Sequence, residues 1–166
     1  MSRGGSPAQV QNQFRQGSAV VAGSCGHPLK TEQFLGGILA VANNIANFSE
    51  RIRALTFLGD HSSHEGFIHA KLNPKVKPTF LYRKDSPTIV KRRFIENYFF
   101  TKLMEIYEIN DGLLSSEDNE SLCKALSAEL PNYDVVIVMD FGHGMFSEEA
   151  IKLICSSAKF LAVNAQ

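Results

Sequence analysis

Residues 132–154, NYDVVIVMDFGHGMFSEEAIKLI, decide the fold of this chain. They begin with an unbroken apolar, mostly β-branched run at 135–139, which is typical of a strand in a parallel sheet that helices cover on both faces. The run ends at Asp140, and apolar residues return at helical spacing after Ser147. The stretch therefore predicts a central strand, a turn and a helix, and with them an α/β fold.

The turn between this strand and this helix has the sequence DFGHG, residues 140–144. In an open α/β sheet, ligands bind at the turns that leave the carboxyl ends of the strands, because loop atoms and helix N-termini converge there. We therefore expect the whole turn, with Asp140 and Gly144, to lie on the functional rim of the sheet.

Length and composition indicate one domain with a sizeable core, because the chain has 166 residues. Its 17 acidic and 17 basic residues cancel, so the chain has no overall attraction for nucleic acid or for an anionic membrane. No apolar run reaches the length of a membrane span, and no secretory signal opens the chain. We expect a cytoplasmic protein with neither a nucleic-acid nor a membrane partner.

The cysteines favour reduced thiols over a disulfide framework. Cys25, Cys123 and Cys155 are odd in number and have no CxxC spacing. Because Cys123 and Cys155 fall on the apolar side of predicted helices, we expect both to fill the core.

The first third predicts a tail followed by the start of a domain. Residues 1–26 are rich in Gly, Ser and Gln and predict a flexible tail, ahead of a domain over residues 27–166. Gly36 and Gly37 then open an amphipathic helix, which carries Asn44 on its polar side. Glycines at that place let a ligand approach the unpaired amides of the first turn, although a diglycine is more often a turn or packing device.

A strand is expected next, followed by a short helix for which Ser62 and Glu65 form a capping box. Asp60, His61 and His64 lie close together between them. They lack further ligands at a suitable spacing, so we favour a polar turn over a metal site.

The middle third predicts half-buried antiparallel strands, because charged and apolar residues roughly alternate there. The expected strands lie at residues 78–83, 88–95 and 99–109. Lys91, Arg92 and Arg93 make the second of them basic. On spacing alone, a solvated edge strand that uses charge against aggregation is favoured over a ligand contact. A helix capped by Ser115 or Ser116 and a second apolar strand at residues 159–163 complete the expected elements.

The order of four motifs resembles ribokinase-like carbohydrate kinases, the phosphofructokinase B family. The motifs are the diglycine, a strand ending in Gly-Asp, the segment SPTIVKRRFI at 86–95, and the strand followed by DFGHG. The resemblance covers about residues 31–166 and is greatest to the branch that holds the kinase half of heptose 7-phosphate kinase/nucleotidyltransferases. It implies a partial ribokinase-like αβα sandwich with a β-rich lid at about residues 78–109.

The resemblance also implies a site for a sugar or sugar phosphate. Gly36 and Gly37 match the diglycine whose backbone approaches the sugar, and Asn44 matches an asparagine of the same helix. Asp140 and Gly144 match the Asp and Gly of the family's loop after the later strand.

A phosphate contact is implied for the basic strand. Thr88, Lys91 and Arg93 match a Thr-x-x-Lys-x-Arg pattern that contacts a phosphorylated substrate. A lysine and an arginine two residues apart project from the same face of a strand, which suits a phosphate dianion. With the resemblance, this role becomes the favoured one for Lys91 and Arg93.

The resemblance implies a sugar or sugar-phosphate kinase whose full-length form uses ATP and Mg²⁺. The family's catalytic base and its Gly-Ala-Gly-Asp anion hole have no match in this chain, so we expect it to be an inactive fragment, without a catalytic residue, a metal ligand or a bound cofactor of its own. Only Asn164, which stands where the family has an aspartate after the next strand, is a candidate cofactor contact.

A non-catalytic module is the alternative. Ala40, Asn164 and Gln166 replace family residues, which favours a kinase-like domain that binds a sugar phosphate or mediates assembly beside a fused nucleotidyltransferase. In many family members the lids of two subunits pack together, and the apolar residues Phe94, Phe99, Phe100 and Met104 predict such a homodimer here.

Overall fold

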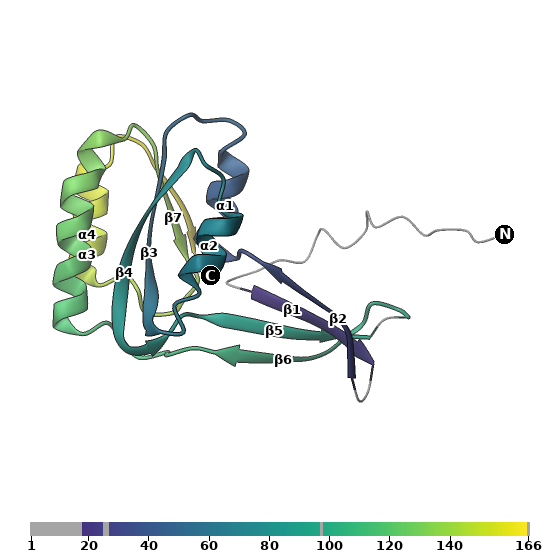
Figure 1. Cartoon of the computed structure of the whole chain (residues 1–166). Helices are drawn as coiled ribbons and strands as arrows, with labels where there is room; N and C mark the ends of the chain where they lie inside the picture. The colour runs from purple at the N-terminus through teal and green to yellow at the C-terminus, as the bar shows by residue number, and fades with distance from the viewer. Residues whose placement is uncertain (1–17, 25–26, 97, 166) are drawn as a thin grey trace.

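The chain folds into an α/β core from which a β-sheet extends (Figure 1). The computed structural model describes residues 18–24, 27–96 and 98–165. In chain order the elements are β1 (Ser18–Ser24), β2 (His27–Phe34), α1 (Gly37–Ile45), β3 (Ile52–His61), α2 (Glu65–Lys71), β4 (Val76–Pro87), β5 (Val90–Ile95), β6 (Lys102–Glu108), α3 (Ser116–Glu129), a 3-10 turn (Leu130–Asn132), β7 (Val136–Asp140), α4 (Glu148–Ser157) and β8 (Leu161–Ala165).

The core has three layers, which confirms the predicted α/β sandwich. β3 pairs with β4 and β7 pairs with β8, both in parallel. Figure 1 shows α1 and α2 on one side of these strands and α3 and α4 on the other. Among the described residues, no helix is long and apolar enough to span a membrane.

Side chains of β3 alternate between two apolar clusters. Ala54 and Leu58 belong to the α1-side cluster, which also contains Leu39, Ala42, Ala46, Ile68 and Val76. Leu55 and Phe57 pack against the α3-side cluster, which contains Leu122, Leu126, Leu130, Ala150 and Ile154. Successive strand residues point to opposite faces, so a strand with no polar alternation is buried from both sides.

The caps of the two long helices follow the sequence. Ser115 Oγ accepts a hydrogen bond from the Asp118 amide across 3.0 Å, and Ser147 Oγ accepts one from the Ala150 amide across 3.0 Å. Each bond satisfies a first-turn donor that has no partner within the helix.

Two local predictions were wrong. Ser62 does not cap α2, because Ser62 and His64 both have positive φ (50° and 53°), and His64 takes the N-cap position without a side-chain cap. Cys155 is exposed on α4 instead of filling the core, while Cys123 is partly buried. Burial raises the pKa of the Cys123 thiol.

The extending sheet, here called the lid, has the strand order β2-β1-β5-β6. β1 pairs antiparallel with β2 and parallel with β5, and β5 pairs antiparallel with β6. The lid thus contains Ser18–Ser24, which had been predicted as part of a tail over residues 1–26. The rest of that predicted tail, residues 1–17 and 25–26, lies outside the described residues.

The predicted lid strand at 78–83 belongs to the core. These residues are part of β4, and their register runs in parallel along β3 from Ala54↔Pro78 to Gly59↔Arg83. β4 alternates charged and apolar residues, which suggested a half-exposed strand. Its apolar positions Phe80 and Leu81 instead pack against the α1-side and α3-side clusters respectively.

The exits of β3 and β4 are held close together at Gly59. A Cβ atom added at Gly59 would lie 2.2 Å from the Ser86 carbonyl oxygen and 2.3 Å from the Thr88 nitrogen. Beside it, the Asp60 carboxylate accepts hydrogen bonds from the Asp85 and Ser86 amides across 2.9 and 3.2 Å. The Asp85 amide bond and the His61 side chain lower the pKa of Asp60. The passage from the core into the lid is therefore fixed by backbone contact.

We expect Gly59→Ala to destabilise the chain by about 3 kcal/mol or more, because the methyl group would meet backbone atoms that cannot move aside singly. Gly66→Ala is the matched control, since nothing lies within 4 Å of the added atom. It should stay within about 1 kcal/mol of the parent. Urea unfolding followed by circular dichroism measures both, and equal stability of the two variants would contradict the close approach.

Candidate functional site

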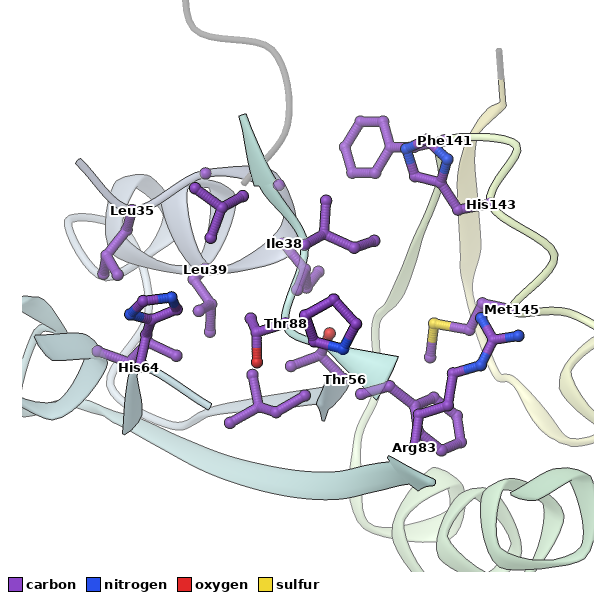
Figure 2. Close-up of a pocket in the computed structure, with 18 of the residues that line it drawn as sticks. Leu35, Ile38, Leu39, Thr56, His64, Arg83, Thr88, Phe141, His143 and Met145 are labelled. Atoms are coloured by element: carbon purple, nitrogen blue, oxygen red, sulfur yellow. The ribbon is translucent and has the colours of Figure 1, made fainter. Parts of the chain in front are cut away.

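A cavity of about 260 Å³ lies where the carboxyl ends of β3, β4 and β7 meet the lid (Figure 2). Four predicted site residues line it: Gly36, Gly37, Thr88 and Asp140. They come from the start of α1, the entry to β5 and the end of β7. The turns that leave parallel strands have thus converged on one place, as the fold class requires.

The cavity combines an apolar wall with a few polar groups. Its labelled apolar side chains in Figure 2 include Leu35, Ile38, Leu39, Phe141 and Met145. The polar and charged lining comes from Gln33, Thr56, His64, Arg83, Ser86, Thr88, Arg92, Asn110, Asp140 and His143. Such a mixture is typical of small-molecule sites, although the volume is just below their usual range of about 300–1,000 Å³.

Backbone conformation at the diglycine leaves room for a ligand. Gly36 is the extended residue before α1, and Gly37 has a φ of 52°, in the left-handed region that favours glycine. The first turn of a helix presents amide groups without helical partners. The two glycines therefore offer backbone donors to the cavity with no Cβ atom in front of them.

Thr88 is held by two hydrogen bonds. Its Oγ1 accepts from the Gly59 amide across 2.9 Å and donates to the Ser63 carbonyl across 3.1 Å. The hydroxyl is thus oriented by the close approach of β3 to the chain after β4.

Asp140 shapes the DFGHG turn. Its Oδ1 accepts from the Gly142 amide across 2.9 Å, and both Gly142 and Gly144 have positive φ (73° and 69°). Gly144 does not line the cavity; an added Cβ atom there would lie 3.2 Å from the Gly112 carbonyl oxygen. Of the two loop residues predicted for the site, one faces the cavity and the other fits the turn against a neighbouring loop.

Asn44 and Asn164 lie away from the cavity. Asn44 is exposed near the end of α1, and Asn164 is exposed on β8. In the described part of the chain, no group of three or more His, Cys, Asp or Glu is arranged to hold a metal ion. The predicted roles of Asn44 as a sugar contact and of Asn164 as a cofactor contact stay predictions.

The three basic side chains of β5 project from opposite faces of the strand. Arg92 lines the cavity, whereas Lys91 and Arg93 do not. Both of the latter are mostly buried on the other face, with side-chain exposures of 10% and 12%. The phosphate contact of Lys91 and Arg93 stays a prediction, and Arg92 is a cavity-lining cation that was not predicted as a site residue. Strand alternation from Thr88 through Val90 to Arg92 was the signal that could have found it.

On the face of the lid away from the cavity, Glu105 of β6 forms ion pairs with three cations. Arg93 Nε donates to Glu105 Oε1, Lys91 Nζ lies 3.9 Å from the same oxygen, and Lys102 Nζ lies 3.1 Å from Oε2. Burial alone would raise the pKa of Glu105, but these cations hold it at about 2. Lys91 also lies over the Tyr107 ring, 4.3 Å from its centroid. The buried Glu105 carboxylate thus neutralises positive charge of Lys91 and Arg93, which the sequence alone shows as part of a basic run.

Arg83, another cation of the cavity wall, is occupied by the backbone. Its guanidinium donates to the carbonyls of Asn110, Gly112 and Leu113 across 2.9, 2.7 and 3.0 Å. It joins β4 to the loop before α3 and was not predicted as a site residue. His143 Nδ1 lies 3.9 Å from Asp111 Oδ1 at the same edge.

Comparison with known proteins places these features in a family context. The chain matches no protein-family model. It is 25% identical over 134 residues to the bifunctional protein HldE of Rhodopseudomonas palustris strain BisB5, which covers 80% of this chain and 27% of the relative. It is 26% identical over 128 residues to HldE of Shewanella denitrificans, which covers 77% of this chain and 26% of the relative. The chain therefore spans about a quarter of the length of these curated relatives.

Solved structures share the fold. A possible 1-phosphofructokinase from Thermotoga maritima has a TM-score of 0.69 at 14% identity, over 90% of this chain and 51% of that chain. Phosphofructokinase-2 from Escherichia coli, solved with fructose-6-phosphate, has a TM-score of 0.60 at 13% identity, over 92% and 52% of the two chains. Ribokinase from Giardia lamblia has a TM-score of 0.53 at 10% identity, over 92% and 49%.

These likenesses confirm the ribokinase-like fold, and the similarity to HldE confirms the predicted resemblance to the heptose 7-phosphate kinase/nucleotidyltransferase branch.

We expect stability to depend on pH through Glu105. Its pKa is about 2 in the folded chain against an ordinary 4.5, so it stabilises the fold above pH 4.5, and this stability is lost as the pH falls from 4.5 towards 2. Glu105→Gln should cost about 1.5–3 kcal/mol at neutral pH, because charged donors lose a charged acceptor. It should also flatten the dependence in that acidic window.

Thermal melts at stepped pH values measure this effect. Glu120→Gln, at an exposed position of α3, is the control and should melt like the parent throughout. Parallel pH curves for Glu105→Gln and the parent would show that Glu105 carries no such linkage.

Proposed function

We propose that this chain, which has the ribokinase-like fold and a sequence similar to HldE proteins, is the substrate-binding portion of a sugar or sugar-phosphate kinase. The observation that carries the proposal is the convergence of Gly36, Gly37, Thr88 and Asp140 on one cavity at the carboxyl ends of the core strands. These residues are far apart in sequence and come from three separate elements. The comparisons support a relation to sugar kinases, and the role of the cavity is our inference.

The chemistry of the lining suits a polyhydroxylated anion. The Asp140 carboxylate accepts hydrogen bonds from sugar hydroxyls, and the diglycine amides donate to sugar oxygens. Arg92 supplies the cation for a phosphate group, because a guanidinium binds phosphate oxygens in a bidentate manner. Its side chain is 39% exposed and pairs with Glu108, so a phosphate dianion at the cavity mouth can take over that pairing.

Lys91 and Arg93 provide the competing position for the phosphate. They were predicted from the Thr-x-x-Lys-x-Arg pattern, and they lie against Glu105 on the other face of the lid. Binding there requires a substrate to displace a carboxylate that is already paired with several cations. Charge-assisted bonds inside a protein are costly to leave unmade, so we favour Arg92.

Phosphoryl transfer is assigned to the full-length protein. ATP and Mg²⁺ supply the phosphate and neutralise its charge in kinases. We infer that residues beyond those of this chain hold both, and that the chain alone binds a sugar phosphate without transferring phosphate. A non-catalytic module beside a fused nucleotidyltransferase is the second candidate, favoured by the exposed place of Asn164 away from the cavity.

Calorimetric titration with hexose and heptose phosphates, and with the same sugars lacking phosphate, tests this function. We expect heat from the phosphorylated sugars. Arg92→Ala should weaken binding about tenfold or more, as the loss of a charge-assisted bond of about 1.5–3 kcal/mol implies. Arg93→Ala is the matched control from the adjacent position, and a melting curve verifies that it stays folded.

The two variants separate the two phosphate positions. Loss of binding in Arg93→Ala with none in Arg92→Ala would move the phosphate to the Lys91 and Arg93 face. The absence of heat from every sugar phosphate with the parent chain would reject the proposed function.

A homodimer through the lid is also proposed. Phe99 and Phe100 are 82% and 67% exposed and Met104 is also exposed, whereas Phe94 is partly buried. Exposed apolar surface of this kind marks interaction sites. We expect sedimentation velocity to show a dimer that dissociates on dilution, and Phe99→Ser with Phe100→Ser to give monomers at the same concentration. A parent chain that is monomeric at high concentration would reject the dimer.

A further inference from the structure

His64 lines the candidate cavity from an uncommon backbone conformation. It is the N-cap residue of α2 and has a φ of 53°, in the left-handed region that few non-glycine residues adopt. Within the described structure, its side chain makes no cap hydrogen bond. A glycine would adopt this conformation with less strain, and a serine, aspartate or asparagine would cap the helix. Local structure therefore does not account for a histidine at this position.

Contacts on both sides hold His64 in this conformation. The carbonyl of the preceding residue, Ser63, accepts a hydrogen bond from Thr88 Oγ1 across 3.1 Å. The carbonyl of His64 accepts one from the Ile68 amide across 3.0 Å. Strained residues of this kind persist where the surrounding structure fixes them, and they cluster at functional sites. The bond through Ser63 also keeps His64 in a fixed relation to Thr88, a second residue of the cavity wall.

The imidazole lies beside an apolar part of the cavity wall. Figure 2 shows His64 on the side that Leu35 and Leu39 form, and His143 at the opposite end of the view. His64 is exposed, so its ring is open to a ligand in the cavity. The diglycine that follows Leu35 in the chain lines the same cavity. Backbone amides, an apolar surface and one imidazole are thus available to the same ligand.

Several other polar side chains of the cavity are already engaged by the protein. Arg83 donates to three backbone carbonyls. Asn110 Nδ2 donates to Ser86 Oγ across 2.7 Å. In contrast, the His64 imidazole has no hydrogen-bond or ion-pair partner within the part of the chain that the structure describes. Both of its ring nitrogens can therefore serve a ligand.

We infer that His64 is a specificity-determining residue of the cavity, which hydrogen-bonds one hydroxyl group of the sugar. The inference rests on the proposed function of the cavity. A neutral imidazole has one donor and one acceptor nitrogen, which suits a hydroxyl group. A phosphate dianion placed against Leu35 and Leu39 would lose hydration to apolar side chains, so the phosphate stays with Arg92. The apolar wall covers the C–H edge of the same sugar.

Calorimetry with the tightest-binding sugar phosphate and its singly deoxygenated forms tests the inference. For the parent chain, one deoxy form should bind about tenfold more weakly than the full sugar, because the imidazole loses its partner. His64→Ala keeps the Cβ atom, and with it the backbone strain, but lacks the ring. It should bind the full sugar about tenfold more weakly and bind that same deoxy form equally well. A purely structural role would weaken all the sugars alike and leave their ratio unchanged.

Relief of strain separates recognition from folding. His64→Gly and Ser62→Gly should both melt at or above the temperature of the parent, because Ser62 also has a positive φ, of 50°, which glycine adopts freely. Only His64→Gly should bind the sugar phosphate more weakly, since Ser62 is not among the described residues that line the cavity. An equal loss of binding in the two glycine variants would assign the effect to the turn and overturn the inference.

The proposed function and the role of His64 fail on different results. The absence of binding by the parent chain to every sugar phosphate rejects the function. Binding by the parent with the same preference among deoxy forms in His64→Ala rejects the role of His64 and leaves the function standing.

Discussion

Burial of β3 from both sides is the constraint on which the rest of the structure depends. Its alternate side chains enter two separate apolar clusters, with Ala54 and Leu58 facing one and Leu55 and Phe57 facing the other. The strand joins α1 to α3 and α4 through this packing, and Arg53 adds an ion pair to Glu129 of α3. At its exit, Gly59 brings the chain after β4 into contact, and the Gly59 amide holds the Thr88 hydroxyl at the candidate cavity. The position of Thr88 at the site therefore depends on the close approach of β3 to the chain after β4.

Local sequence predicted the elements better than their partners. The unbroken apolar run at 135–139 predicted β7, and Ser115 and Ser147 indicated the starts of α3 and α4. Both the apolar run and the serine caps act within a few residues, so the local sequence is enough to recognise them. The partner of β4 depends on residues more than twenty positions away. Its alternation of charged and apolar residues fits a lid strand and a core strand equally well, and only burial against both clusters distinguishes the two. β1 was missed because its neighbourhood is rich in glycine and serine.

The candidate site shows the same division. The order of the sequence motifs pointed to four residues that line one cavity, Gly36, Gly37, Thr88 and Asp140. Each motif lies at the end of an element, and the fold places these ends at the same rim of the sheet. Arg92 was missed because a run of three basic residues does not by itself show which of them faces the cavity, and only the alternation from Thr88 through Val90 indicates it. The partner that decides this is Glu105, a single acidic residue on the next strand. A charge pattern along one strand therefore has to be considered together with the strand opposite.

The lid also sets the order in which the chain can assemble. β1 with β2 and β5 with β6 are two hairpins whose partners are close in sequence, but the seam between them pairs Ser18 with Lys91 in parallel. Local hairpins close within microseconds, whereas a parallel seam between distant segments must first lose the entropy of the whole intervening loop. All of α1, β3, α2 and β4 lies within that loop. We therefore expect the seam to form late in folding, after the core has brought the two hairpins together.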